Sequence, residues 1–379
     1  MTMPSSIKHN QTTWLSKWLI NSDKQESHEI ASKDDPDSFA VCVMVMDSNH
    51  FLIEWMAYHY HVLPMRRIIL YVDPNSQTSP LPIIERWEYR MSITAWNASN
   101  YLTEHVAKRQ YGDFVWRQRI FLADCLRQFK KEGREWVMIT DSDEYVMISD
   151  RVRNPQDKLS PMNYVPHANI RIPSQKEPGS VLKLIQQEGV LLPYTEEHTK
   201  TVACITMPRR NFGTRQAADG INATILGNPY SDFQTFAWHY WGGSTKPGKT
   251  FNNVRLVDYT QIHNNLRIHK PFPDEVCKGQ VFPIEHESIF VANHYPGSLK
   301  QIFFRSNDAR ASKFGGNVTA YWLDRLNTLS DPNKYNNRDS GLISSWLPGF
   351  VECVGEEEAK RLLKNVGDPK LAATTSTSN

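Results

Sequence analysis

The stretch Trp136-Val137-Met138-Ile139-Thr140-Asp141-Ser142-Asp143-Glu144-Tyr145 joins an apolar run to a cluster of acidic residues. Its first four residues carry a β-branched side chain at every second position, which predicts a short buried strand. The apolar character then stops, and three carboxylates follow within four residues. A carboxylate pair at the carboxyl end of a central strand lies where open α/β sheets bind their ligands. We therefore expect this stretch to place a functional site at one end of a sheet.

Asp141 and Asp143 are separated by a single residue. In an extended or tightly turning backbone, this spacing directs both side chains toward one small volume. Two carboxylates so placed repel each other unless a cation lies between them, and a hard divalent ion with oxygen ligands suits the position. The alternative is a solvated turn, because an Asp-x-Asp pair occurs by chance about once in a chain of this length. The buried strand that precedes the pair favours the metal site.

Composition excludes some classes of protein. The chain has 379 residues and a net charge of +2, without a block of Lys and Arg, which argues against a dedicated nucleic-acid-binding protein. Its longest apolar runs, such as Ala40 to Met46, are far too short to span a membrane. We therefore expect a soluble cytoplasmic protein with no membrane span, or a protein of the Golgi lumen if an anchor has been removed.

The five cysteines are far apart, odd in number and free of any Cys-x-x-Cys pair. This spacing excludes a zinc ribbon and argues against a disulfide framework. We expect Cys42, inside an apolar strand, to be a small buried hydrophobe.

Strand and helix patterns alternate four times between residues 40 and 139, which predicts an α/β fold with a parallel, doubly wound sheet flanked by helices. The patterns predict strands at Ala40–Met46, Arg67–Val72, Ser92–Trp96 and Trp136–Ile139, with helices at Phe51–His61, Leu81–Tyr89 and Tyr111–Lys131. Further strands are predicted at Val202–Pro208, Asn253–Tyr259 and Ser288–Ala292, and further helices at Val181–Glu188, Ala320–Leu329 and Ala359–Leu363. We expect an N-terminal arm and linker over residues 1–38, a single large domain over 39–330, and a C-terminal extension with a disordered tail over 331–379.

Several motifs of other enzyme classes do not occur. The chain has no Gly-x-x-x-x-Gly-Lys-Ser/Thr loop and no Gly-x-Gly-x-x-Gly in its first strand-to-helix turn, which disfavours a P-loop enzyme or a dehydrogenase. It has no Gly-x-Ser-x-Gly elbow either, which argues against an α/β-hydrolase.

The region from about Ala40 to Arg310 resembles the GT-A glycosyltransferases, nearest to glycosyltransferase family 92 and to family 2-like proteins. The similarity is carried by Met46-Asp47-Ser48-Asn49-His50-Phe51-Leu52-Ile53-Glu54-Trp55 with Tyr58-His59, Ile69-Leu70-Tyr71-Val72-Asp73, Asp141 to Tyr145, Arg210-Asn211-Phe212-Gly213, Lys246 to Lys249, Ile262-His263 and Asn293-His294-Tyr295. It implies a GT-A (Rossmann-like), mostly parallel central sheet. Asp47 and Asn49 stand where the family often has Asn-Glu, and the segment after Arg310 has no clear counterpart.

The resemblance implies a metal-dependent glycosyltransferase that uses Mn²⁺ or Mg²⁺. Such an enzyme moves a sugar from a UDP- or GDP-sugar to a hydroxyl of a glycan or glycoprotein, with inversion. A cation held by Asp143, and by Asp141 through water or ribose, would neutralise the charge on the leaving diphosphate. His294 resembles the late histidine that completes this metal site. A hydrogen-bonded structural histidine is the alternative.

Four further residues are candidates for donor contacts. Asp47 and Asp73 end the first two predicted strands, where a nucleoside would lie, and each could instead cap the turn or helix that follows. Lys246 and Lys249 lie in or beside the Gly-rich stretch from Gly242 to Gly248, which we expect to be either a diphosphate-binding loop or an ordinary surface loop.

An inverting mechanism needs a carboxylate that deprotonates the acceptor hydroxyl. Asp219, Asp232 and Asp308 are the candidates, and no motif selects among them. Two other functions stay open at this point. A metal-dependent nucleotidyltransferase would use the same carboxylates on a nucleoside triphosphate, and a non-catalytic carbohydrate-binding protein would bind glycan without turnover.

Overall fold

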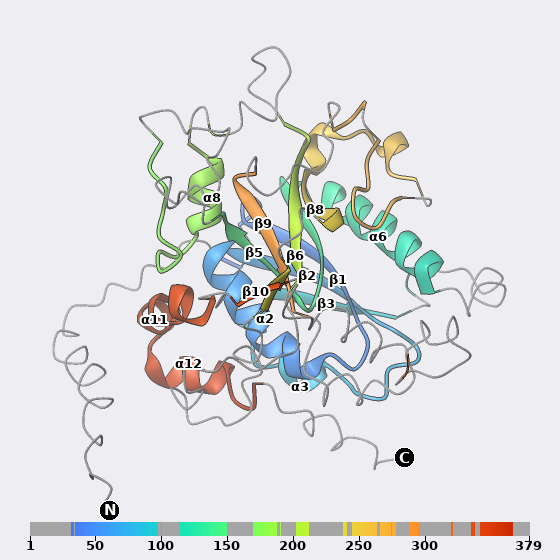
Figure 1. Ribbon diagram of the computed structural model, residues 1–379. Helices are drawn as coiled ribbons and strands as arrows, with labels where there is room; N and C mark the ends of the chain where they lie inside the picture. Colours follow the sequence, from blue (N-terminus) through green and yellow to red (C-terminus); the bar gives the residue numbers. More distant parts are fainter. Residues whose placement is uncertain are drawn as a thin grey trace, which may run out of the picture.

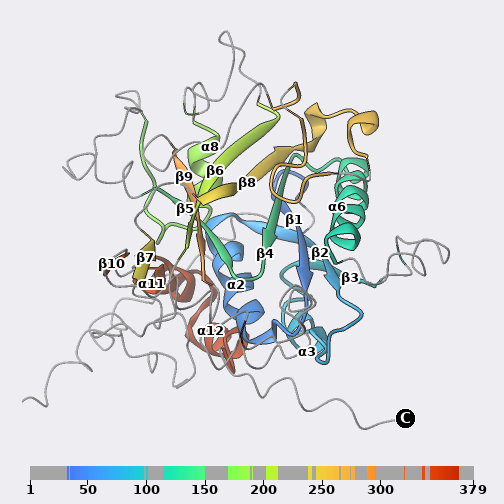
Figure 2. The same cartoon turned by 45° about the vertical axis from the view of Figure 1, so that its right-hand side comes forward.

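The computed structural model describes residues 32–33, 35–97, 100, 114–149, 170–187, 190, 202–211, 238–240, 245–263, 266–273, 275–277, 288–295, 320, 335–337 and 342–366. The main sheet has eight strands in the order β3-β2-β1-β4-β8-β6-β9-β5 (Figures 1 and 2). Its strands are β1 (Phe39–Val45), β2 (Met65–Val72), β3 (Ser92–Trp96), β4 (Trp136–Asp141), β5 (Glu144–Ile148), β6 (Cys204–Asn211), β8 (Thr245–Asn253) and β9 (Phe290–His294). The helices are α2 (Asn49–Val62), α3 (Leu81–Ile84), α6 (Phe114–Lys131), α8 (Ser180–Ile185), α11 (Leu342–Val354) and α12 (Glu356–Leu362).

The predicted α/β fold, with a mostly parallel central sheet flanked by helices, is confirmed, and the sheet is mixed rather than purely parallel. Strands β3, β2, β1 and β4 run parallel to one another, as expected from the strand–helix alternation. Beyond β4, β8 runs antiparallel to both β4 and β6, and β5 runs antiparallel to β9. The doubly wound pattern stops at β4 because a two-residue turn, rather than a crossover helix, joins β4 to β5.

Helices cover both faces of the sheet, as the α/β prediction required. Helix α6 packs on one face, where its apolar residues share a core with Ala40 and Cys42 of β1. Helix α2 packs on the other face, and all of its residues are buried. A helix that is covered on every side lies inside a domain rather than on its surface. Helices α11 and α12 provide the outer cover of α2 (Figure 1).

The expected C-terminal extension thus contributes to the main core. Trp346, Phe350 and Leu362 belong to the same buried cluster as Trp55 of α2. The sequence analysis expected only the second of these helices. Of the predicted helix over 320–329, only Ala320 is described, and it is helical. The N-terminal arm before residue 32 and the tail after residue 366 lie outside the described residues.

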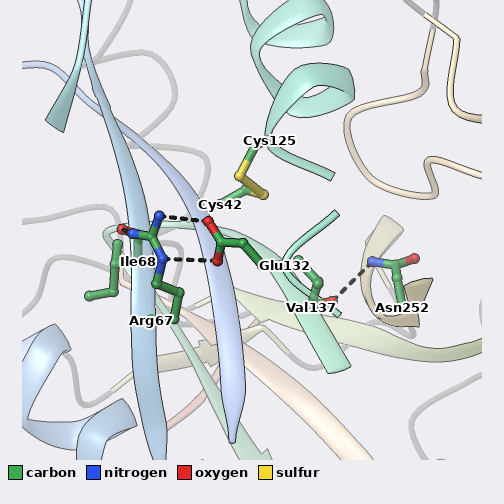
Figure 3. Close-up of a disulfide and its surroundings, with 7 residues drawn as sticks. All are labelled: Cys42, Arg67, Ile68, Cys125, Glu132, Val137 and Asn252. Atoms are coloured by element: carbon green, nitrogen blue, oxygen red, sulfur yellow. Dashed lines mark hydrogen bonds and ion pairs between the residues drawn. A yellow bond between two sulfur atoms is a disulfide. The ribbon is translucent and has the colours of Figure 1, made fainter. Parts of the chain in front are cut away.

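Four of the five cysteines form disulfides, which corrects the expectation from their spacing. Cys42 of β1 bonds to Cys125 of α6, beside the ion pair of Arg67 with Glu132 (Figure 3). Cys204 of β6 bonds to Cys277. The partners are separated by 83 and 73 residues, so no local spacing marks them. The fold brings them together because α6 and the segment before Cys277 pack on the same face of the sheet.

We expect the native protein to contain one free thiol, that of Cys353. Thiol titration in denaturant without reductant should therefore detect one thiol per chain, and the same titration after reduction should detect five. Peptide mapping without reduction should recover the two cross-linked pairs, Cys42–Cys125 and Cys204–Cys277. Detection of five thiols in oxidatively purified protein would contradict this pairing.

Among the described residues, none of the helices has the length and apolar character needed to cross a membrane.

Candidate active site

The acidic stretch forms the turn between β4 and β5. Asp141 is the last residue of β4, Ser142 and Asp143 form the turn, and Glu144 begins β5. The buried strand predicted from Trp136 to Ile139 is confirmed. Strand β5 was not predicted, and it directs the chain away to the edge of the sheet, where it pairs with β9. The turn lies at the carboxyl end of the parallel β1–β4 pair, the end at which open α/β sheets bind ligands.

His294, the last residue of β9, lies beside the turn that carries Asp143, and its register partner on β5 is Glu144. Nε2 of His294 is 3.5 Å from Oδ2 of Asp143, and both side chains are mostly buried. Nδ1 of His294 is 2.8 Å from Oδ1 of Asn211. Because an amide oxygen only accepts, Nδ1 donates this hydrogen bond, and the ring is oriented with Nε2 toward Asp143.

Asp143 and His294 are placed as two ligands of one divalent cation would be. A metal-bound histidine characteristically donates its second ring N–H to a carbonyl or carboxylate oxygen, which fixes the tautomer and the ring orientation. Asn211 supplies that oxygen from the end of β6, which runs parallel to β9 in the register Asn211 to His294. A carboxylate and an imidazole are a donor set that Mn²⁺ accepts.

Asp141 does not join Asp143 and His294 in a set of three ligands. The part of the chain that the structure describes contains no group of three or more His, Cys, Asp or Glu side chains placed to hold a metal. Instead, Oδ2 of Asp141 accepts from Nζ of Lys249 at 2.8 Å. The two aspartates thus face different partners, although the sequence analysis expected them to face one volume.

Lys249 belongs to a buried cluster of charges. Its Nζ is also 2.7 Å from Oε2 of Glu144, and Nη1 of Arg209 is 3.3 Å from Oε1 of the same carboxylate. The side chains of Glu144 and Lys249 are 0% and 2% exposed. A buried ion is tolerated only where partners of opposite charge satisfy it, and here two cations and two carboxylates alternate.

The charges in this cluster fix one another's ionisation. Burial alone raises the pKa of Glu144, but the neighbouring Lys249 and Arg209 outweigh it and lower that pKa to about 2. Burial alone lowers the pKa of Lys249, but Asp141 and Glu144 outweigh it and raise that pKa above its usual value. Glu144 and Lys249 are therefore both charged at neutral pH.

Lys249 lies in strand β8 rather than in the expected Gly-rich loop. Strand β8 begins at Thr245, so the backbone of Lys246 is part of the same strand, while its side chain lies outside the described residues. The predicted strand over 253–259 is replaced by two short 3-10 helices, η5 (Val254–Leu256) and η6 (Tyr259–Gln261).

Asp47 and Asp73 lie at the carboxyl ends of β1 and β2, where the sequence placed them, and both are buried. Oδ1 of Asp47 accepts from the backbone N–H groups of Gln77 and Thr78, at 2.8 and 2.9 Å. Oδ2 of Asp73 is 3.0 Å from Nη2 of Arg117 on α6. Both contacts hold loops and helices at this end of the sheet, in keeping with the capping alternative, and a donor contact by either residue stays a prediction.

The three candidate bases, Asp219, Asp232 and Asp308, lie outside the described residues.

His269 is a residue that the sequence analysis did not single out. Val137 and Ile139 of β4 point into the core that contains α6, so Asp141, two residues on, points to the same face. His269 lies close enough to Lys249, Asp141 and Glu144 to interact with their charges, which places it near this cluster. Burial, followed by the positive charge of Lys249, lowers the pKa of His269 to about 4, so its imidazole is neutral at pH 7. No sequence motif marks it, because its neighbours come from distant strands.

The fold and this site define a class: an α/β protein with a charged ligand site at the carboxyl ends of its parallel strands. Within that class, the chain belongs to glycosyltransferase family 92, whose model matches residues 37–315, and it is a transferase. The predicted family is therefore confirmed. No curated protein matches the chain significantly.

Several solved structures have a distant likeness to the chain. Residues 1–349 of TarS from S. aureus share 12% identity over 88% of this chain and 89% of that chain, with a TM-score of 0.31. The same fragment in complex with UDP has a TM-score of 0.30, with 12% identity over 88% of this chain and 89% of that chain. The mannosyltransferase PcManGT from Pyrobaculum calidifontis, in complex with GDP-Man and Mn²⁺, shares 10% identity over 97% of this chain and 82% of that chain, with a TM-score of 0.32. These TM-scores are too low to carry an argument about the site.

Proposed function

We propose that the chain is a metal-dependent, inverting glycosyltransferase that moves a sugar from a UDP- or GDP-sugar to a hydroxyl of a glycan or glycoprotein. The observation that carries the proposal is the Asp143–His294 pair, with the histidine tautomer set by Asn211. Family membership supplies the reaction class.

Asp143 and His294 would hold Mn²⁺ or Mg²⁺. Two protein ligands suffice for such an ion, because divalent cations in nucleotide sites complete their coordination with substrate phosphates and water. When bound, the cation supplies positive charge that stabilises the diphosphate leaving group.

The chain's own residues prepare the site for that charge. The hydrogen bond between His294 and Asn211 favours the proton on Nδ1 and orients the ring so that Nε2 faces Asp143. Lys249 and Arg209 neutralise Glu144 directly behind the turn, which keeps that carboxylate from competing for the cation. Asp141 is more exposed than Asp143, and we assign it to the ribose or to a metal-bound water of the donor.

No sequence motif identifies the residues that bind and deprotonate the acceptor. Asp219, Asp232 and Asp308 remain the candidates for the carboxylate that deprotonates the acceptor hydroxyl. His269 is neutral at pH 7 and lies at the same end of the sheet, so we add it as a hydrogen-bonding contact to substrate. Lys246 remains a candidate for a contact with the donor diphosphate.

The two disulfides support maturation in an oxidising compartment, such as the Golgi lumen, over the expected cytoplasmic location. Disulfides persist where thiols are not kept reduced, and they are rare in cytosolic proteins.

The experiment that tests the function is a screen of UDP- and GDP-sugars, with nucleoside triphosphates as competitors, each with Mn²⁺ and with EDTA. We expect one sugar nucleotide to raise the melting temperature only with Mn²⁺, because a ligand that binds the native state stabilises it. The same sugar nucleotide should be consumed slowly, with release of its nucleoside diphosphate. Metal-dependent turnover of a triphosphate alone would identify a nucleotidyltransferase, and glycan binding without consumption of any donor would identify a carbohydrate-binding protein.

A further inference from the structure

A chain of four aromatic rings runs from helix α11 to the turn that carries Asp143. The ring of Trp346 meets that of Tyr58 edge to face, with centroids 5.7 Å apart. Tyr58 meets Tyr145 at 5.2 Å, and Tyr145 meets Tyr295 at 5.6 Å. These distances and tilts are those that aromatic pairs prefer, so the contacts stabilise beyond the area that they bury.

The last ring of this chain is joined directly to the candidate metal pair. The backbone N–H of Tyr295 donates to the carbonyl oxygen of Asp143 at 2.8 Å. In the β5–β9 register, Glu144 lies opposite His294, so this hydrogen bond continues the strand pairing by one step into the turn. Tyr145 follows the acidic turn by two residues, and Tyr295 follows His294 directly. The separation of Asp143 from His294 therefore depends on how the two tyrosines pack.

The second ring is fixed by hydrogen bonds as well as by packing. The hydroxyl of Tyr58 donates to the carbonyl oxygen of Val146 on β5 at 2.6 Å, and it accepts from Nε2 of Gln175 at 3.2 Å. A shift of this ring would strain a buried hydrogen bond to the backbone of β5, and buried hydrogen bonds are costly to lose. Trp346 is the ring of α11 that closes over Tyr58.

We propose that Trp346 is a positioning residue for the Asp143–His294 pair, so that α11 supports the active site. Helix α11 begins at Leu342, beyond the region matched by the family model, which ends at residue 315. The catalytic consequence rests on the proposed function, because it requires the pair to bind a cation. The effect of α11 on the structure of the turn does not depend on the proposed function.

Phe350 offers a matched control on the same helix, one turn further along. Its ring is as fully buried as that of Trp346, and it contacts Tyr60, His61 and Trp87 as well as Trp346. None of those partners outside α11 belongs to the chain of four rings. Truncation at either position removes a buried aromatic side chain, which typically costs several kcal/mol of stability, but only truncation of Trp346 removes the contact to Tyr58.

The test compares Trp346→Leu, Trp346→Phe and Phe350→Leu in the full chain. We expect the two leucine variants to lose similar stability in urea unfolding. Only Trp346→Leu should raise the Kd for Mn²⁺, read from the electron paramagnetic resonance signal of free Mn²⁺, by about tenfold, the lower end of the effects that outer contacts have on metal sites. Only Trp346→Leu should speed amide exchange in peptides spanning 143–148 and 290–295. Trp346→Phe keeps a ring against Tyr58, so its Mn²⁺ affinity and its amide exchange in these peptides should be close to those of the wild type.

Equal Mn²⁺ affinity and equal exchange in the two leucine variants would overturn the proposal. If the wild-type protein bound no Mn²⁺, the proposed function would fail, and the exchange comparison alone would decide whether Trp346 positions the turn. If Trp346→Leu did not fold, Trp346→Met would take its place against Phe350→Leu, because methionine fills more of the space but still removes the ring that meets Tyr58.

Discussion

Replacement of Asp143 by alanine is expected to lower metal-dependent transfer by about 10³-fold, the upper range for loss of a single group that stabilises developing charge. Asp143 is the carboxylate that faces Nε2 of His294, and alanine removes it from the cation. The backbone carbonyl that accepts from Tyr295 remains, so the turn should keep its shape. We expect the free energy of unfolding to change by no more than about 1 kcal/mol, as for most substitutions outside the core.

The measurement is initial-rate kinetics with the donor found in the screen, together with urea unfolding. Glu357→Ala is the control, because this carboxylate is on α12 and 89% exposed. It should leave both rate and stability unchanged. Transfer at near wild-type rates by Asp143→Ala would remove the assignment of this residue to the metal.

Replacement of Lys249 by methionine is expected to give the largest loss of stability. Methionine fills a similar volume but leaves the carboxylates of Glu144 and Asp141 without their ammonium partner. Removal of one partner of a buried ion pair typically costs about 3–5 kcal/mol, because the remaining charge stays buried. Urea unfolding at pH 7 measures the loss.

Lys360 is a matched control for this substitution. Its ammonium also contacts two carboxylates, those of Glu356 and Glu357, each at 2.9 Å, but on the exposed surface of α12. Water screens such pairs, so Lys360→Met should change stability little. Equal losses in the two variants would contradict the claim that burial makes the Lys249 cluster costly to break.

The stability that Lys249→Met loses relative to the wild type should become smaller as the pH falls. The pKa of Glu144 in the folded protein, about 2, lies below its ordinary value of 4.5, so its pairing stabilises the wild type above about pH 4.5 and is lost as the pH falls toward 2. In Lys249→Met, Glu144 can take up a proton at a higher pH, which relieves its buried charge. The stability difference between wild type and variant should therefore shrink from pH 7 to about pH 4. A difference that does not depend on pH would contradict this account.

The sequence was sufficient for the parallel half of the fold. The strand Ser92–Trp96 was predicted at its observed bounds. The strand before the acidic motif was predicted correctly because a buried strand shows as a continuous apolar run. The alternation of strands and helices up to Asp141 predicted the parallel order and the helices on both faces.

What the sequence did not show depends on contacts between distant residues. Lys249 lies 108 residues from Asp141, and the glycines before it are typical of a loop, so neither its burial nor its strand was predictable. The Cys42–Cys125 pair spans 83 residues without a motif. Helix α11 contains Pro348 and Gly349, which argue against a helix. A side chain at Gly349 would collide with the backbone of Lys176, so glycine allows α11 to pack closely there.

The most direct test of the metal site is an anomalous difference map from a crystal soaked with Mn²⁺ and the nucleoside diphosphate of the donor. The account predicts a single strong peak between Asp143 and His294, about 2.0–2.2 Å from the carboxylate oxygen and from Nε2, with Asn211 still bonded to Nδ1. A map without a peak at this pair, or with Mn²⁺ bound by the nucleotide away from both side chains, would contradict it.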